Sequence, residues 1–432
     1  MKTKSGSKAD RFSRREFLKS TAATGLTTLL ATSPRIYAGG SDKIRIGLIG
    51  CGARGRHDSR NCLNSAENVE ITAMGDLFKD QLDGAIAELS EALPNKIKVT
   101  PDTCFAGFDA YKKVLDCDID MVMLTEIPHF RPAHLRAAVE AGKHVFMEKP
   151  VAVDPVGVRS VIESSDIAEG KGLKIVAGTQ MRRIAHLVAG IERIHNGQIG
   201  DILGGQCIRI SDGMMNWGMR QRKAEWSDME WQLRRWLFLT WLSGDFIAEQ
   251  HIHNLDIINW ALNSHPVQCI GMGGRQVRTA AEYGNVFDHI AVEYEYPNGA
   301  RIQYMGEQTD GCTDRNDQWL GGTKGTSYLD FGVAIIKGQD PWKYEGEIPN
   351  PEIKQHADHI AAIREGKSLN EGRRVAESTL TAIMGRMSAY TGRALKWDWA
   401  MNASKLDLTP ASYEFGELPM PPVAMPGKTQ II

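Results

Sequence analysis

The sequence predicts an α/β fold in two parts: a doubly wound parallel sheet, then an α+β domain with a large, mostly antiparallel, open sheet. From residue 43 to about 170, short apolar runs alternate with segments of helical periodicity, which is typical of a parallel sheet. Further along, strand-like runs follow one another with few helices between them, as in antiparallel sheets. The length of 432 residues also favours two domains.

The first part is predicted to contain alternating strands and helices. In the helix expected over 77–93, Leu82, Ile86, Leu89 and Leu93 recur at helical spacing. We place the end of this dinucleotide-binding type of domain near Gly170, so that it spans 43–170. Its strands are expected at 44–49, 69–74, 119–124 and 144–147, with a short one within 97–109, and its helices at 77–93, 108–115, 133–141 and 156–169.

The second domain is predicted to span 171–400. An Asn298-Gly299 pair between two strand-like runs indicates a β-hairpin. Five prolines after residue 400 predict that 401–432 forms an extended C-terminal arm. Strands are expected at 173–179, 204–211, 267–277, 287–296, 300–306 and 324–331, and helices at 186–197, 249–262, 353–365 and 372–391.

The N-terminal segment has the pattern of a bacterial twin-arginine export signal. Arg14 and Arg15 stand in a Ser-Arg-Arg-Glu-Phe-Leu-Lys motif, and a weakly apolar stretch over 20–31 is too short to span a bilayer. We expect cleavage after Ala38, so that 1–38 is a signal peptide read by the twin-arginine translocation machinery and the mature protein is periplasmic or exported. The alternative is an amphipathic tail.

Composition narrows the class of protein. The chain is 42% hydrophobic and 24% charged, which is typical of a globular protein. Its formal net charge of −2 argues against a nucleic-acid binder. The seven cysteines show no Cys-x-x-Cys spacing, so neither a disulfide framework nor a zinc ribbon is predicted.

The main motif is a Gly-x-Gly-x-x-Gly sequence that follows the first apolar run. In such a loop the first glycine allows a tight turn, the second lets the backbone approach a pyrophosphate, and the third lets the helix pack close to the strand. The phosphates would lie at a helix N-terminus, where unpaired N–H groups favour anions. The predicted cofactor-binding loop consists of Gly50, Cys51, Gly52, Ala53, Arg54 and Gly55.

A second cofactor contact is expected from Asp76, which ends the next strand-like run. It lies 21 residues after Gly55, close to the offset of a carboxylate that binds the adenosine ribose. A carboxylate there favours NAD over NADP, although Lys79 nearby keeps NADP open. The alternative is that Asp76 is an ordinary turn residue.

Two loops at the carboxyl ends of predicted parallel strands are expected to face the ligand. Thr125 opens the loop after the strand at 119–124, and Glu148-Lys149-Pro150 closes the strand at 144–147. A lysine at this edge can donate a hydrogen bond to a substrate hydroxyl or shuttle its proton. The alternative is a surface lysine after a strand.

A helix expected over 249–262 carries the other candidate groups. Glu249, His253 and Asp256 are spaced i, i+4 and i+7, which places them on one helix face. A histidine held by a carboxylate can act as the general base in hydroxyl oxidation. The alternatives are a solvated polar face, or a metal site formed with His251; three residues at i, i+2 and i+4 cannot share one helix face, and no metal is predicted.

Together these motifs resemble those of the glucose–fructose oxidoreductase / inositol dehydrogenase / MocA family. The glycine loop, Asp76, Glu148-Lys149-Pro150 and the 249–256 run occur in that family's order, and the resemblance covers about 43–400. It implies that Lys149 and His253 flank the nicotinamide and the substrate carbon. It also implies that Arg182 corresponds to a substrate-domain arginine; the alternative there is a surface arginine.

The chain departs from the family pattern at three places. Glu249 stands where the family usually has Asp, and His251 stands where it usually has Gly, which places an extra imidazole near the site. The loop that is commonly Thr-Pro is here Thr125-Glu126-Ile127-Pro128. These changes leave the substrate and the type of reaction open.

The resulting prediction is an exported NAD(P)-dependent oxidoreductase that acts on a carbohydrate or polyol and forms a homo-oligomer, a dimer or a tetramer. Tryptophans concentrated between 217 and 260 could stack on sugar rings; alternatively they pack an insertion or a subunit interface. Because an exported cofactor must be regenerated in place, it should be tightly bound. A redox-neutral, NAD-dependent glycoside-cleaving enzyme with His251 as a base is the first alternative, and a non-catalytic sugar sensor is the second.

Overall fold

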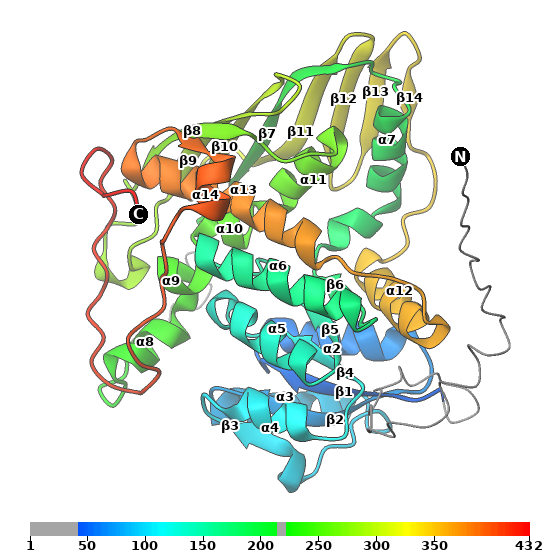
Figure 1. Ribbon diagram of the computed structural model, residues 1–432, viewed down its shortest axis with the longest axis vertical. Helices are drawn as coiled ribbons and strands as arrows, with labels where there is room; N and C mark the ends of the chain where they lie inside the picture. The colour runs from blue at the N-terminus through cyan, green and yellow to red at the C-terminus, as the bar shows by residue number, and fades with distance from the viewer. Residues whose placement is uncertain (1–41, 214–221) are drawn as a thin grey trace, which may run out of the picture. The chain divides into compact units, whose positions relative to one another are not determined.

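The computed structural model describes residues 42–213 and 222–432. The predicted signal peptide over 1–38 and Trp217 lie outside the described residues. Six parallel strands form the first sheet, in the order β3-β2-β1-β4-β5-β6 (Figure 1). These strands are β1 (Ile44–Ile49), β2 (Val69–Asp76), β3 (Cys104–Ala106), β4 (Met121–Leu124), β5 (His144–Met147) and β6 (Ile175–Ala177).

This strand order is that of doubly wound dinucleotide-binding sheets, in which ligands bind where the order reverses, here at the carboxyl ends of β1 and β4. The central strand β4 is apolar and buried along its whole length, and its neighbour β1 is buried except at Arg45. The strands alternate with helices as expected: α2 (Ala53–Ser65), α3 (Lys79–Ala92), α4 (Ala110–Asp116), α5 (Arg131–Glu140) and α6 (Pro155–Gly170).

The predicted boundary near Gly170 needs a correction. The strand expected at 173–179 is β6, which pairs in parallel with β5 and therefore belongs to the first sheet. Its residues Ile175–Ala177 are all buried, as is typical of a strand in a parallel sheet that helices cover on both faces. The first sheet therefore extends beyond 170, and the chain leaves it only after β6.

Nine strands form the second sheet, in the order β14-β13-β12-β11-β7-β10-β9-β8-β15. All neighbours are antiparallel except β7 and β10, which confirms the predicted fold class. Gly299 turns the predicted hairpin between β9 and β10 with a φ of 82°. The strands are β7 (Ile202–Ser211), β8 (Gln268–Gly274), β9 (His289–Glu295), β10 (Arg301–Gln308), β11 (Arg315–Gly322), β12 (Gly325–Asp330), β13 (Ala334–Gly338), β14 (Trp342–Lys343) and β15 (Leu395–Lys396).

Helices cover one face of this sheet and link it to the first. Helix α13 is buried along most of its length and packs against α6 of the first sheet and β8 of the second. Helix α12 returns to the first sheet and packs against α2. The helices after β6 are α7 (Ala185–His195), α8 (Asp228–Arg234), α9 (Thr240–Ser243), α10 (Phe246–Glu249), α11 (Ile252–Leu262), α12 (Pro351–Glu365), α13 (Gly372–Thr391) and α14 (Trp397–Asn402).

The prediction of one continuous helix over 249–262 is wrong. This segment is divided into α10, which ends at Glu249, and α11, which begins at Ile252. Gln250 has φ −113° and ψ −48° and His251 caps α11, so the chain changes direction at the candidate site.

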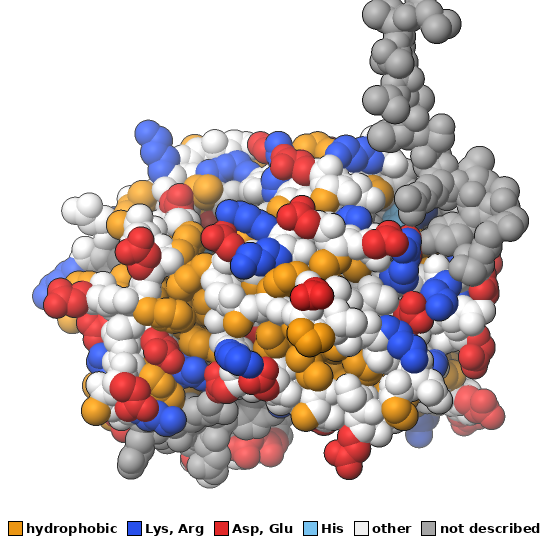
Figure 2. Space-filling view, turned by 90° about the horizontal axis from the view of Figure 1, so that it is seen from below, with side chains coloured by type: hydrophobic (Ala, Val, Ile, Leu, Met, Phe, Trp, Pro, Cys, Tyr) orange, Lys and Arg blue, Asp and Glu red, His pale blue; other side chains and the backbone are white. Residues whose placement is uncertain are grey.

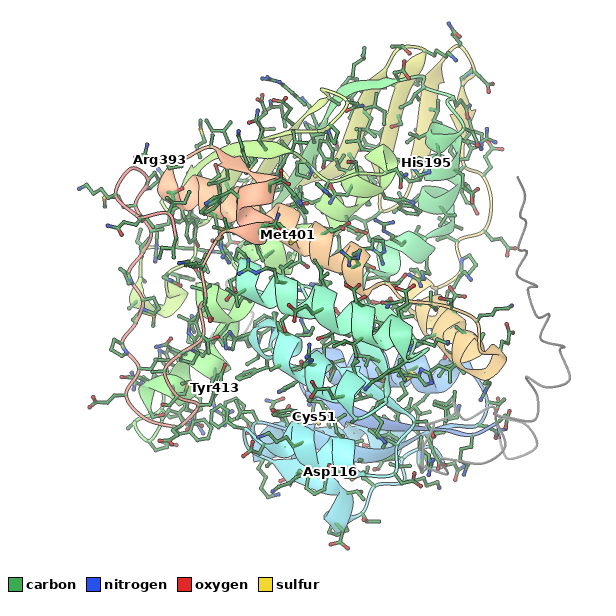
Figure 3. All side chains as sticks on the ribbon, in the orientation of Figure 1. Cys51, Asp116, His195, Arg393, Met401 and Tyr413 are labelled. Atoms are coloured by element: carbon green, nitrogen blue, oxygen red, sulfur yellow. The ribbon has the colours of Figure 1, made fainter. Side chains whose placement is uncertain are left out.

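The C-terminal arm after α14 has no helix or strand in the described structure and packs against the first sheet and α8. Tyr413, labelled in Figure 3, and Phe415 contact Phe108, with ring centroids 5.9 and 5.2 Å apart. The backbone of the arm accepts a hydrogen bond from Met229 N at the carbonyl of Gly416. The arm therefore joins α8 to the edge of the first sheet.

Charged side chains of both signs are interspersed on the face shown in Figure 2. Among the residues that the structure describes, no helix is both long and apolar enough to cross a membrane.

Candidate active site

A cavity of about 1120 Å³ lies between the carboxyl edge of the first sheet and the second domain. The first sheet contributes its glycine loop and the ends of β2, β4 and β5, while β7, α10 and α11 contribute the opposite wall. Of the predicted cofactor residues, those that line it are Gly50, Gly52, Ala53, Arg54, Asp76, Thr125, Glu148 and Lys149. The other two residues of the loop, Cys51 and Gly55, are buried and do not line the cavity.

The three glycines of the loop have the surroundings that their predicted roles require. Gly50 has a φ of 93°, and a Cβ there would lie 2.3 Å from Glu126 N. A Cβ on Gly55 would lie 1.9 Å from the carbonyl oxygen of Gly50, so the helix packs as closely as expected. A Cβ on Gly52 would meet no heavy atom of the described structure within 4 Å. The open side of Gly52 faces the cavity, where a pyrophosphate would approach the α2 N-terminus.

Asp76 is held at the end of β2 by two backbone donors. Its Oδ2 accepts a hydrogen bond from Cys51 N at 2.6 Å, and its Oδ1 accepts one from Phe78 N at 2.7 Å. Burial raises the pKa of Asp76 to about 6, against the lowering effect of these two N–H groups. The carboxylate thus ties the glycine loop to β2 and remains in the cavity wall.

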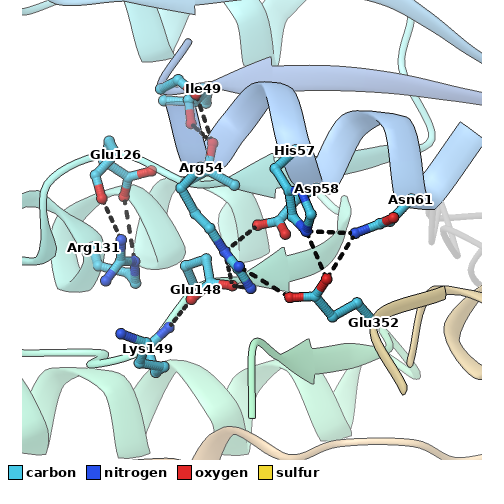
Figure 4. Close-up of polar contacts among 12 residues, drawn as sticks. Ile49, Arg54, His57, Asp58, Asn61, Glu126, Arg131, Glu148, Lys149 and Glu352 are labelled. Carbon is cyan, nitrogen blue, oxygen red and sulfur yellow. Dashed lines mark hydrogen bonds and ion pairs between the residues drawn. The ribbon is translucent and has the colours of Figure 1, made fainter. Parts of the chain in front are cut away.

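Arg54 is the centre of a buried ionic network rather than a free cation (Figure 4). Its Nη2 lies 2.7 Å from Glu148 Oε1, and its Nη1 lies 3.2 Å from Glu352 Oε1. Asp58 Oδ2 lies 3.2 Å from Arg54 Nε, and burial raises the Asp58 pKa well above its ordinary value. Because Glu352 belongs to α12, this network fixes α12 against the glycine loop.

Lys149 and Glu249 form an ion pair in the cavity wall. Lys149 Nζ donates to Glu249 Oε1 at 3.0 Å and also to the Glu249 carbonyl. Each side chain keeps 13% of its surface exposed, which leaves Lys149 accessible from the cavity. An ammonium bound to a carboxylate is a hydrogen-bond donor to a substrate oxygen.

His253 lies in the same cavity wall, on the first turn of α11. Burial, followed by the positive charges of Lys149, Arg209 and Arg54, lowers its pKa well below the ordinary value. The imidazole is therefore neutral at neutral pH, when one ring nitrogen can accept a proton. Its Nδ1 is buried and has no hydrogen-bond partner among the described residues.

Asp256 does not hold His253 in the manner that the helix spacing predicts. Its Oδ2 and Oδ1 accept hydrogen bonds from Arg182 at 2.7 and 2.9 Å, and Oδ1 accepts others from Arg374 and Ser378. The two guanidinium groups lower the pKa of Asp256 far below its usual range despite its burial. Neither Arg182 nor Asp256 lines the cavity. Asp256 was interpreted as a substrate-side residue of the face it shares with His253, and Arg182 as a substrate-domain arginine; the structure instead pairs them with each other in a buried ion cluster that includes Arg374.

His251 also lies outside the cavity lining. Its Nδ1 is 2.6 Å from the hydroxyl of Tyr304 on β10, and burial lowers its pKa well below the ordinary value. The break between α10 and α11 turns this ring toward the sheet. The imidazole of His251 therefore does not face the cavity. It is not placed to act as the base that the redox-neutral alternative assigned to it.

Several cavity residues were not predicted from the sequence. Among these are Arg209 of β7, Gln180 and Gln250, which face the cavity from the second domain. Trp236, near α8, also lines the cavity and is one of the tryptophans between 217 and 260 that were expected either to stack on a sugar ring or to pack an insertion or a subunit interface. Arg209 between Ile208 and Ile210, in the strand expected at 204–211, was the available signal for this residue. Within 42–213 and 222–432, no three His, Cys, Asp or Glu side chains are grouped so that they could hold a metal ion.

Two sheets with a cavity at the reversal of strand order define a two-domain dinucleotide-binding fold. Residues 44–178 match the model of a family described as an oxidoreductase family with an NAD-binding Rossmann fold. The matched residues contain the glycine loop, Asp76 and Glu148-Lys149-Pro150, so this match agrees with the resemblance that these motifs indicate.

Curated relatives include inositol 2-dehydrogenases. The one from Serratia proteamaculans is 26% identical over 261 residues, which are 60% of this chain and 66% of that enzyme. The one from Pseudomonas fluorescens is 26% identical over 224 residues, 51% of this chain and 55% of that enzyme. The matches span less than two thirds of the length of these relatives.

Solved structures share the fold over most of the chain. A levoglucosan dehydrogenase in complex with NADH and levoglucosan has a TM-score of 0.66 and 16% identity, covering 82% of this chain and 99% of that one. An aldose–aldose oxidoreductase from Caulobacter crescentus, complexed with glycerol, has a TM-score of 0.64 and 17% identity, with coverages of 82% and 99%. At these identities the likeness concerns the fold.

Proposed function

We propose that the protein is an NAD-dependent dehydrogenase of a sugar, polyol or sugar derivative. The observation that carries this proposal is that Lys149, Glu249 and His253 line the same cavity as the glycine loop and Asp76. A nicotinamide cofactor bound along that loop would supply the hydride acceptor. The inositol dehydrogenases among the relatives support a polyhydroxylated substrate.

The three cavity residues have different roles in this proposal. His253, neutral and in the cavity wall, accepts the proton of the reacting hydroxyl. Lys149 donates a hydrogen bond to the same oxygen and stabilises its developing negative charge. Glu249 positions Lys149 through the 3.0 Å ion pair.

The proposal is tested with the purified full chain and a panel of hexoses, inositols and anhydrosugars. We expect at least one to reduce bound NAD, seen as new absorbance of the reduced nicotinamide. Nucleotide released on denaturation should be NAD rather than NADP, because Asp76 would repel a 2′-phosphate, and should be present without added cofactor. Sugar binding without any reduction would favour the non-catalytic sensor, and a protein that binds no nicotinamide nucleotide would refute the dehydrogenase.

Export through the twin-arginine route accompanies this proposal, because that route carries folded proteins and would deliver the cofactor inside the enzyme. The support is the Arg14-Arg15 motif of the sequence. The double substitution Arg14→Lys and Arg15→Lys should leave the uncleaved precursor in the cytoplasm, measured by fractionation and immunoblotting. Unimpaired delivery of this variant to the periplasm would contradict the export proposal.

A homo-oligomer is supported by the uncovered face of the second sheet. The strand register aligns Met272, Ala291 and Met305 across β8, β9 and β10, and Ile270 and Trp319 lie on the same face. Met272 is 72% exposed and Ile270 54%; apolar side chains gathered in this way mark association surfaces. Light scattering of the purified protein should give the mass of a dimer or tetramer, and a monomer at micromolar concentration would exclude this proposal.

A further inference from the structure

Arg209 differs from the other arginines of the cavity wall in its partners. Arg54, Arg56, Arg131 and Arg234 each have a carboxylate within 4.0 Å, as does Arg60. Within the described residues, Arg209 has none, and the segment 214–221 contains no Asp or Glu in its sequence. Among the described residues, Arg209 is thus the arginine of this cavity wall that forms no ion pair.

The contacts that Arg209 does make are neutral and involve one nitrogen. Its Nη1 donates to the Gln250 carbonyl and to Asn254 Oδ1, both at 3.3 Å. The guanidinium also lies over the ring of Phe331, 5.8 Å from its centroid. Among the described residues, Nε and Nη2 have no acceptor. The contacts hold the guanidinium in place and leave one edge of its fork free.

Burial disfavours the charge of Arg209, as the lowered pKa of its guanidinium shows. A charge taken from water without a counter-ion destabilises a protein unless a ligand supplies that counter-ion. Nearby Glu249 is already paired with Lys149, and His253 is neutral. Asp212 is exposed and forms no ion pair with Arg209. Among the described residues, Arg209 is therefore a cationic side chain of the cavity wall that forms no ion pair.

We propose that the substrate is a carbohydrate acid whose carboxylate binds the free edge of Arg209. This inference rests on the proposed dehydrogenase function and specifies its substrate class. Two parallel N–H donors of a guanidinium match the two oxygens of a carboxylate. A phosphate ester, with a charge of about −1.5 to −2, would exceed the single positive charge of Arg209 and be repelled by nearby Glu249. In this proposal the reacting hydroxyl belongs to the same sugar and points toward His253 of α11 and Lys149, which follows β5.

The test compares matched ligands on the NAD-loaded full chain by calorimetry. Glucuronate, galacturonate and mannuronate are compared with glucose, galactose and mannose, and with glucose 6-phosphate. We expect at least one uronate to bind about 10-fold more tightly than its parent sugar, and the difference to shrink between about 0.05 and about 0.5 M salt. Binding of no uronate more tightly than its parent, or tighter binding of the phosphate, would overturn the proposal.

Variants locate the effect at Arg209. Arg209→Gln should bring uronate and parent sugar to within about 2-fold of each other, whereas Arg209→Lys should keep part of the preference because the charge remains. Arg301→Gln is the matched control, since Arg301 lies exposed on the adjacent strand β10. A preference that survives in Arg209→Gln would overturn the assignment. Reduction of NAD by a neutral sugar, together with uronates that neither bind more tightly than their parent sugars nor reduce NAD, would sink this inference while leaving the dehydrogenase intact.

Discussion

Gly52→Val is expected to lower NAD affinity by about 100-fold or more, roughly 2.8 kcal/mol, without weakening the fold. Gly52 has φ −66° and ψ −176°, an extended conformation that valine also adopts. Its Cβ would meet no described heavy atom within 4 Å. The new side chain would therefore project only into the cavity, where the backbone N–H groups at the start of α2 would receive a pyrophosphate.

Nucleotide titration and thermal unfolding of the same preparation separate binding from stability. The midpoint of unfolding without nucleotide should stay within the range of surface substitutions, about 0.5 kcal/mol. Gly170→Val is the matched control, because a Cβ there also meets open space but lies at the end of α6, away from the cavity. If Gly52→Val binds NAD as tightly as the parent, the phosphates do not lie at this loop.

The parts of the fold that the sequence predicted are those with strong local patterns. β1, β4 and β5 are short and mostly apolar, with Arg45 and His144 as their polar residues, and the hairpin before β10 has an Asn-Gly turn. By contrast, β11 reads Arg-Asn-Asp-Gln-Trp-Leu-Gly-Gly and has no alternation. It forms a strand because β7 and β12 supply hydrogen-bond partners on both sides, which is information that lies elsewhere in the chain.

The residues of the candidate site also differ in whether local sequence was enough to predict them. The glycine loop is contiguous in sequence, so its geometry could be predicted residue by residue. Asp256 could not be interpreted correctly, because helix spacing shows which face a residue shares and not what packs against it. Arg182 and Arg374, 74 and 118 residues away in sequence, pair with that carboxylate. Arg209 was missed for the complementary reason: it is distinguished by having no ion-pair partner among the described residues, and sequence spacing does not show which residues lie around it.

The surroundings of His253 in the structure change the pH dependence that we expect for NAD reduction. An imidazole with an ordinary pKa would lose activity below about pH 6.5. In the structure, burial and three neighbouring cations lower the His253 pKa well below that value, so the proton-accepting form persists as the pH falls through 6.5. The rate of NAD reduction should therefore stay nearly constant between about pH 6 and 8. A fall in rate with a midpoint near 6.5 would mean that His253 is not the group that accepts the proton.

His253→Ala and Lys149→Ala are each expected to lower the single-turnover rate of NAD reduction by about 10²–10⁴, while NAD affinity stays within a few fold. The first variant removes the neutral proton acceptor, and the second removes the ammonium that binds the reacting oxygen. Neither side chain belongs to the glycine loop, so nucleotide binding should be retained. Stopped-flow absorbance with pre-bound NAD measures the rate, and a parallel nucleotide titration measures affinity.

Two matched variants control for a general effect of losing a histidine or a lysine. His289→Ala removes a ring that pairs with Asp288 outside the cavity, and Lys354→Ala removes an exposed lysine of α12; both should react at the parent rate. Glu249→Gln should fall between the parent and Lys149→Ala, because it keeps the side-chain oxygen near Lys149 Nζ but removes the charge that orients it. Full-rate reduction by His253→Ala or Lys149→Ala would exclude that residue from the proton and oxygen chemistry. Equal loss of NAD affinity and rate would instead assign the residue to cofactor binding.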